Sequence, residues 1–177
     1  MLGPTAGYSP QIGVLVSEMT WMRAAVLRAV KNMTTSQLDF LLDDKANRIG
    51  ALLLHLAATE RLYQLNTFDK VGIQSLEKDP RFAEWQAPME LGDPAREKIK
   101  GHDLPYYLKI LAETRDQTLA EFRKRDDKWL LAVDPSFVWG PTNNLCKWFH
   151  VCEHESHHSG QISLIAGRAS GSKSGRG

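Results

Sequence analysis

The sequence lacks any long hydrophobic run, since no stretch approaches the roughly 20 apolar residues that a membrane-spanning helix needs. Its beginning, MLGPTAGYSPQIG, has neither the basic nor the apolar region of a secretion signal. An excess of charge is also missing, because 22 Lys and Arg residues stand against 21 Asp and Glu residues. We therefore expect a cytoplasmic protein that binds neither a membrane nor nucleic acid.

Cysteine is scarce as well. Cys146 and Cys152 are the only two, and they lie six residues apart in a segment with helical periodicity. A helix rises about 1.5 Å per residue, so their Cα atoms are expected about 9 Å apart, too far for a disulfide bond. We expect two reduced thiols that pack as small buried side chains and take no part in chemistry.

Signals for β-structure are missing, since no segment alternates apolar and polar residues and no Asn-Gly or Asp-Gly pair joins two apolar runs. Apolar residues instead recur every three or four positions, which predicts four helices at about 10–32, 45–67, 103–125 and 142–167. The expected N-caps are Ser9, Asp43 or Asp44, and Asp103, and the last helix is expected to end at Gly167. The sequence therefore predicts an all-α protein.

The connections between these helices differ in length. About a dozen residues join the first two, whereas residues 68–102 separate the second from the third, which predicts a long crossover with short helical turns. The aromatic link at 126–141 is expected to cover one end of the molecule. We expect a single four-helix bundle domain at 1–167, followed by a disordered Gly/Ser/basic tail at 168–177.

Four of the six histidines lie within nine residues of the last predicted helix: His150, His154, His157 and His158. At about 100° per residue, His154 and His158 share one face, which we place at the centre of the buried stripe. Histidines at i and i+4 can bind one ion through both Nε2 atoms. His55, among the leucines of the second helix, is the candidate third ligand because an unpartnered buried imidazole is costly.

The histidine pattern leaves alternatives open. It also fits an exposed histidine cluster, or a slipped pair of His150 with His154. HESHH, residues 154–158, matches the H-E-x-x-H pattern of zinc proteases, in which Glu155 would activate water. Proteolysis is disfavoured because residues 159–177 contain no Asp, Glu or His for a downstream third ligand, and because Glu155 lies about 80° from the histidine face.

Two motifs, in this order, resemble the DinB/YfiT-like superfamily of metalloenzymes. The first is ALLLHLAATERLYQ, which contains His55, and the second is KWFHVCEHESHHSGQISLI, which contains His154 and His158. The resemblance covers residues 9–167. It implies a four-helix bundle with up-down-down-up connection, a divalent metal ion (Zn, Ni, Fe or Mn) held by those three histidines, and often a homodimer.

One departure from the family pattern is Ser159, which stands where relatives commonly have a basic residue before Gly-Gln. A contact with an anion is therefore not expected at this position. Apolar residues outside the expected stripes, for example Leu15 and Trp21, also favour a homodimer that buries them. We expect Trp129, Trp139 and Trp148 to be packing residues rather than the lining of a substrate pocket.

The resemblance also implies metal-dependent chemistry on a small-molecule substrate. Members of this superfamily include mycothiol-dependent maleylpyruvate isomerase and bacillithiol S-transferases. The leading expectation is therefore a metal-dependent enzyme that transfers a low-molecular-weight thiol, or isomerises its substrate by thiol addition, at an open coordination position. The alternatives are a non-enzymatic metal-binding or stress-response bundle and a metal-dependent hydrolase. A further ligand from His150, His157, Glu60 or Glu153 is left open, and a fourth ligand would favour a structural ion.

Overall fold

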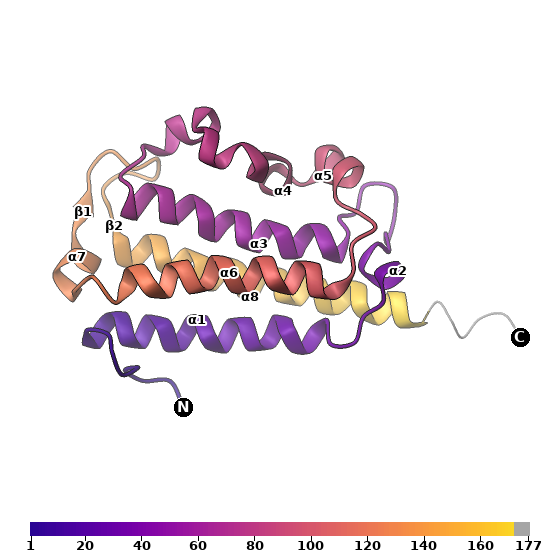
Figure 1. Ribbon diagram of the computed structural model, residues 1–177, viewed down its shortest axis with the longest axis horizontal. Coiled ribbons are helices and arrows are strands. Elements are labelled where there is room, and N and C mark those ends of the chain that lie inside the picture. The colour runs from indigo at the N-terminus through magenta and orange to yellow at the C-terminus, as the bar shows by residue number, and fades with distance from the viewer. Residues whose placement is uncertain (172–177) are drawn as a thin grey trace, which may run out of the picture.

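The computed structural model describes residues 1–171. Four long helices lie side by side in Figure 1: α1 (Pro10–Ala29), α3 (Ile49–Tyr63), α6 (Leu104–Phe122) and α8 (Asn144–Gly171). α1 packs against α8, and α3 packs against both α6 and α8. The described chain is mostly helical, as the apolar periodicity predicts.

The starts of the long helices differ in part from the predicted caps. Asp103 caps α6 as expected, since its carboxylate accepts a hydrogen bond from the backbone N–H of Tyr106. Ser9 precedes α1, but its hydroxyl donates to Asp127 instead of capping. α3 follows Arg48, so the predicted start near residue 45 was too early and neither Asp43 nor Asp44 caps the helix.

The end of α8 was also predicted wrongly. The helix continues through Gly167 to Gly171 because Ile165 and Ala169 keep the apolar face of the helix buried over the extra turn. Residues 168–171, which we expected in the disordered tail, are therefore helical. The remainder of that expected tail, 172–177, lies outside the described residues.

Short helical turns form the connections, as expected for the long crossover. α2 (Thr35–Leu38) lies between α1 and α3. The crossover from α3 to α6 consists of a π-helical turn η1 (Gln64–Phe68), two 3₁₀ segments η2 (Ile73–Lys78) and η3 (Pro80–Trp85), and the short helices α4 (Gln86–Glu90) and α5 (Gly92–Lys98). In Figure 1 this crossover runs back along α3, which contacts both η3 and α4.

The link after α6 covers one end of the molecule (Figure 1). It contains α7 (Asp127–Leu131) and a small antiparallel pair, β1 (Val133–Asp134) and β2 (Thr142–Asn143). Two-residue strands are too short to show alternation, so the all-α expectation missed them. Lys147 of α8 fixes the link, because its buried ammonium donates to Asp134 at 2.8 Å and to Asn66 at 2.9 Å.

Two hydrophobic clusters fill the space between the long helices. One contains Val26, Leu53 and Ile162, and the other contains Met19 and Trp148. Each long helix contributes to both clusters, and along each helix one buried charged residue separates the two contributions. These residues are Arg23 on α1, Glu60 on α3, Arg115 on α6 and Glu155 on α8.

These four residues form a closed, charge-balanced layer. Arg115 donates to Glu60 at 2.8 Å and to Glu155 at 2.9 Å, and Arg23 is paired with the same two carboxylates. Thr118 adds a hydrogen bond of 2.6 Å to Glu60. The burial of two carboxylates is tolerated because each one faces two guanidinium groups.

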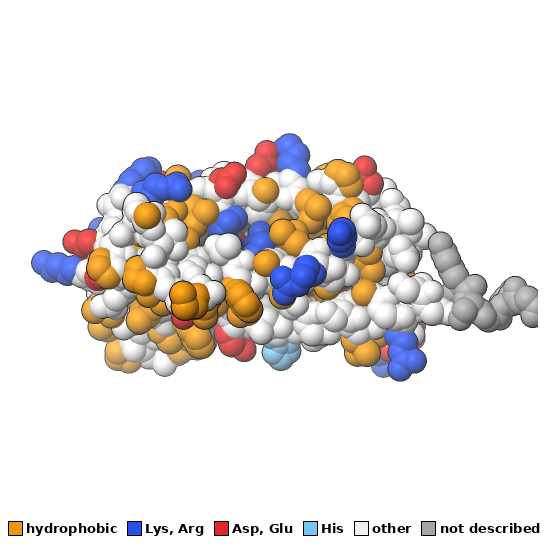
Figure 2. Space-filling view, turned by 90° about the horizontal axis from the view of Figure 1, so that it is seen from below, with side chains coloured by type: hydrophobic (Ala, Val, Ile, Leu, Met, Phe, Trp, Pro, Cys, Tyr) orange, Lys and Arg blue, Asp and Glu red, His pale blue; other side chains and the backbone are white. Residues whose placement is uncertain are grey.

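The surface is hydrophobic in places. Seen from the side of α1, hydrophobic side chains gather over the half of the molecule that holds the start of α1 (Figure 2). Trp21 and Phe149 are each more than half exposed, whereas Leu15, which we expected at the surface, is buried in the second cluster. Between α1 and α8 lies a pocket of about 550 Å³, which Val14 and Phe149 help to line.

Candidate metal centre

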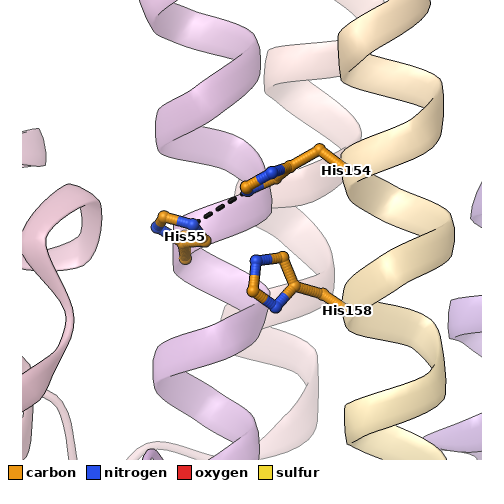
Figure 3. Close-up of side chains that lie close together, drawn as sticks. All are labelled: His55, His154 and His158. Carbon is orange, nitrogen blue, oxygen red and sulfur yellow. Dashed lines mark hydrogen bonds between the residues drawn. The ribbon is translucent and has the colours of Figure 1, made fainter.

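Three histidines from two helices face one another between α3 and α8 (Figure 3). His55 lies in the middle of α3, and His154 and His158 lie one turn apart on α8. The ring centroid of His55 is 4.8 Å from that of His154 and 4.9 Å from that of His158. One ring nitrogen of each lies within 4.8 Å of the other two, so the structure brings together the three residues predicted from sequence.

Hydrogen bonds that Nδ1 donates orient two of these rings. Nδ1 of His55 donates to the carbonyl oxygen of Pro88 in α4 at 2.9 Å, and Nδ1 of His158 donates to Oε1 of Gln161 at 2.8 Å. In a neutral imidazole this places the proton on Nδ1 and leaves the lone pair on Nε2. A metal ion binds an imidazole through such a lone pair on Nε2. Sequence reasoning missed both Pro88 and Gln161.

The spacing of the nitrogens suits a shared ion. Nε2 of His55 lies 2.8 Å from Nε2 of His154. Two imidazoles that bind one ion at about 2.0–2.1 Å and at a right angle hold their nitrogens about 2.9 Å apart. Three neutral nitrogen donors on one side of an ion fit Zn, Ni, Fe and Mn, which all accept imidazole ligands.

Burial keeps the three rings uncharged. Burial and, as a smaller effect, the neighbouring His158 together lower the pKa of His55 to about 4. Burial also lowers the pKa of His154 to about 3, followed by the effect of the other histidines, and it lowers the pKa of His158. All three are therefore neutral at pH 7, the protonation state in which imidazole binds metal.

The polar contacts continue toward the end of the molecule that the 126–141 link covers. Tyr63 lies two turns after His55 on α3, and its hydroxyl is 2.9 Å from Nδ1 of His150, which lies one turn before His154 on α8. Thr59 lies between His55 and Tyr63, and its buried hydroxyl has no hydrogen-bond partner among the described residues. The i, i+4 spacing of these α3 residues was the signal in the sequence that would have found them.

The slipped pair of His150 with His154 does not form the cluster, because the two α8 histidines that lie next to His55 are His154 and His158. His150 is bonded to Tyr63 instead, and His157 is exposed beside His158. Glu153 is also exposed, with its carboxylate 3.9 Å from Nε2 of His150. None of these side chains joins the cluster of three among the residues that the structure describes.

The two buried glutamates also lie away from the histidines. Both Glu60, considered as a fourth ligand, and Glu155, the glutamate of the protease-like motif, are bonded to Arg23 and Arg115. At about 100° per residue, the buried residues of α8 centre about 80° from His154, close to Glu155. The sequence-based prediction centred the buried stripe of α8 on His154 and His158 and was wrong. The structure centres this stripe near Glu155, so His154 lies at its partly exposed edge.

Cysteines and tryptophans follow the expectations only in part. Both cysteines are free, but only Cys152 is buried, which raises the pKa of its thiol to about 12, whereas Cys146 is exposed. Trp148 lies in the core as expected. Trp139 does not, since it is 55% exposed and its ring lies edge-on to His150 at 5.1 Å.

Comparisons with known proteins show the fold and the family of the chain. A solved structure described as the crystal structure of the conserved protein of locus from Enterococcus faecalis has a TM-score of 0.66 and 14% sequence identity, and the match covers 89% of this chain and 96% of that chain. At this identity the likeness shows a shared fold. A search of curated proteins finds no match. The sequence profile of the DinB superfamily matches residues 18–162, most of the chain, and the protein therefore belongs to the DinB superfamily.

Proposed function

We propose that the protein binds a divalent metal ion through His55, His154 and His158 and acts as a metal-dependent enzyme on a small-molecule substrate. The observation that carries this proposal is the convergence of three neutral imidazoles, with two Nε2 atoms 2.8 Å apart. Side-chain and backbone partners of Nδ1 orient two of the rings, as they do around established metal sites.

The ligand set favours catalysis over a structural ion. Among the described residues no fourth His, Cys, Asp or Glu side chain joins the three histidines, and Glu60 is held by two arginines. An ion with three protein ligands keeps at least one position open, which is the arrangement of catalytic zinc sites. His154 is partly exposed, so one edge of the histidine cluster meets solvent.

The reaction that we propose is transfer of a low-molecular-weight thiol from the cytoplasm, or isomerisation by reversible thiol addition. When bound, the ion would lower the pKa of the thiol and so supply thiolate at neutral pH. In transfer, the sulfur forms a bond to an electrophilic carbon while the bond from that carbon to the leaving group breaks with its electron pair, and the leaving group takes up the thiol proton. In isomerisation, the sulfur adds to a double bond and the neighbouring carbon takes up the proton, and the thiol is then eliminated to restore the double bond. Membership of the DinB superfamily supports this class, and neither cysteine of the chain is needed for it.

The metal site is tested by elemental analysis of protein purified without an affinity tag. We expect about one equivalent of a transition metal per chain, and His55→Ala or His154→Ala should lower it steeply because two imidazoles hold a divalent ion far less well than three. His102→Ala is the matched control, since His102 stacks on Tyr106 away from the cluster. Undiminished metal in His55→Ala would remove His55 from the site.

The thiol reaction is tested on cobalt-substituted protein with cysteine, glutathione, mycothiol and bacillithiol. A sulfur-to-cobalt charge-transfer band and conjugation of a model electrophile are the expected results. If no thiol produces either signal, while metal binding is retained, a metal-dependent hydrolase or a non-enzymatic metal-binding bundle replaces the thiol proposal.

We also infer two finer features of the molecule. The crossover along α3 supports the up-down-down-up bundle of the family for the four long helices. The exposed Trp21 and Phe149 on neighbouring helices support a homodimer that covers this face.

A further inference from the structure

A second group of side chains lies beside the three histidines. The ring of His150 is 5.3 Å from that of His154, 5.7 Å from that of Tyr63 and 5.1 Å from that of Trp139. His150 thus joins the histidine cluster to an indole in the link between α6 and α8. The side chains also become more exposed along this path, from 7% for His55 to 30% for His150 and 55% for Trp139.

The hydrogen bond between Tyr63 and His150 sets the outward-facing atom of His150. Among the described residues the Tyr63 hydroxyl has no other acceptor, so it donates to Nδ1 of His150. Neutral His150 then carries its proton on Nε2, the nitrogen that lies 3.9 Å from the exposed carboxylate of Glu153. The Nε2–H of His150 is therefore a hydrogen-bond donor on the side of the exposed Glu153.

Trp139 is held in place although it is exposed. Its ring packs edge-on against Phe137 at 5.1 Å, and the next residue, Gly140, turns the chain with a φ of +90°. The carbonyl oxygen of Gly140 accepts a hydrogen bond from Thr142 at 2.9 Å. An exposed but anchored indole can stack on a ligand without losing much conformational freedom.

We propose that Tyr63, His150 and Trp139 form a substrate subsite beside the metal centre, which binds a planar, unsaturated group carrying a neutral hydrogen-bond acceptor. Trp139 covers the planar group, and Nε2 of His150 donates to its acceptor, for example a ketone oxygen. The carboxylate of Glu153 makes the subsite unfavourable for an anionic group at the same point. This subsite rests on the proposed function, because it places the planar electrophile beside the open metal position, where the thiol would bind.

Three hydroxamates that share one metal-binding group test the subsite on the metal-loaded protein: acetohydroxamate, 4-phenylbutanohydroxamate and 4-oxo-4-phenylbutanohydroxamate. Their dissociation constants are measured by calorimetry. We expect the phenyl compound to bind about fivefold more tightly than acetohydroxamate because of the indole contact. The ketone should add about another fivefold through one hydrogen bond.

Each variant should abolish one of these two gains in affinity. Trp139→Ala should abolish the advantage of the phenyl group, whereas Trp21→Ala, the matched exposed tryptophan on α1, should keep it. His150→Phe and Tyr63→Phe should abolish the advantage of the ketone while metal content and acetohydroxamate affinity stay as in the wild type. The Tyr63→Phe variant keeps the ring, so it reports on the hydrogen bond even if replacement of His150 disturbs folding.

The outcomes separate the subsite from the metal site. Equal affinities for all three hydroxamates on protein that holds its metal would overturn the subsite and leave the proposed function intact. Protein that holds no metal and binds no hydroxamate would overturn the proposed function itself. If the gains from the phenyl group and the ketone persist unchanged in Trp139→Ala and His150→Phe, the ligand contacts lie elsewhere on the molecule and the subsite is overturned.

Discussion

At the scale of single residues, the orientation of His55 and His158 depends on the hydrogen-bond partners of their Nδ1 atoms. His55 and His158 both use Nδ1 as a donor, one to a backbone carbonyl oxygen and one to Gln161. The backbone partner comes from the crossover, 33 residues away in sequence, whereas Gln161 lies on the same helix. Orientation of the site therefore depends on one distant contact and one local contact.

Replacement of Gln161 tests the local contact. Gln161→Leu removes the acceptor of the His158 Nδ1–H, so the ring loses its fixed orientation. We expect metal affinity to fall about tenfold, the lower end of the effect of such partners. Competition with a fluorescent zinc chelator measures the change, and Ser163→Ala, about two and a half turns of α8 after His154 and exposed, is the control. An unchanged affinity would show that the contact does not orient the ring.

The lowered histidine pKa values predict how stability depends on pH. Burial lowers the pKa of His55 from 6.5 to about 4 and that of His154 to about 3, so below pH 6.5 the unfolded chain binds protons that the folded chain does not. The free energy of unfolding of metal-free protein should therefore fall as the pH drops from about 6.5 toward 4. Urea unfolding across this range measures it, and His154→Ala should show a shallower slope. Parallel slopes would exclude His154 as the source.

At the scale of the helices, the charged layer fixes how the four long helices are rotated against one another. Each helix places one charged residue at the same level, and Arg23 also donates to the Leu111 carbonyl oxygen while Arg115 donates to that of Met19, both at 3.0 Å. Any rotation of one helix would leave a buried charge without its partner. The layer thereby holds α3 and α8 in the orientation that turns the three histidines toward one another.

Glu60→Gln should therefore destabilise the protein by about 3–5 kcal/mol, because it leaves two buried guanidinium groups facing only Glu155. The control is Glu121→Gln, which breaks ion pairs with Lys124 and Arg125 at the surface and should cost less than about 1 kcal/mol. Chemical denaturation measures both variants. Equal costs would contradict the role of the buried layer.

At the scale of the whole molecule, hydrophobic side chains lie exposed on the face near the start of α1 (Figure 2). Among the helices of the described chain, none has both the length and the hydropathy to cross a membrane. We propose that a second copy of the chain covers this face, since exposed indole and phenyl rings such as Trp21 and Phe149 gain from burial.

Sedimentation at micromolar concentration tests this assembly. Wild-type protein should sediment at twice the chain mass of 19.9 kDa, and Trp21→Glu should sediment as a single chain because it would bury a charge in the interface. Leu42→Glu, at an exposed position in the connection between α2 and α3, away from the start of α1 (Figure 1), is the control and should stay paired. A wild-type species of 19.9 kDa would contradict the dimer.

Local patterns in the sequence were enough to predict the four long helices and to indicate three candidate histidines. Apolar periodicity and i, i+4 spacing are local properties of a helix, so they are visible without any knowledge of neighbouring helices. They placed the four long helices within a few residues and made His55, His154 and His158 candidates, whereas the resemblance to the DinB superfamily implied these three as the ligand set.

Which neighbours each helix face contacts depends on tertiary contacts. The rotation of α8 depends on Glu155, whose burial is acceptable only because Arg23 and Arg115 arrive from two other helices. The pairing of Tyr63 with His150 likewise depends on the relative position of α3 and α8. Such contacts join residues that are far apart in the chain, and local periodicity carries no information about them because it describes one helix at a time.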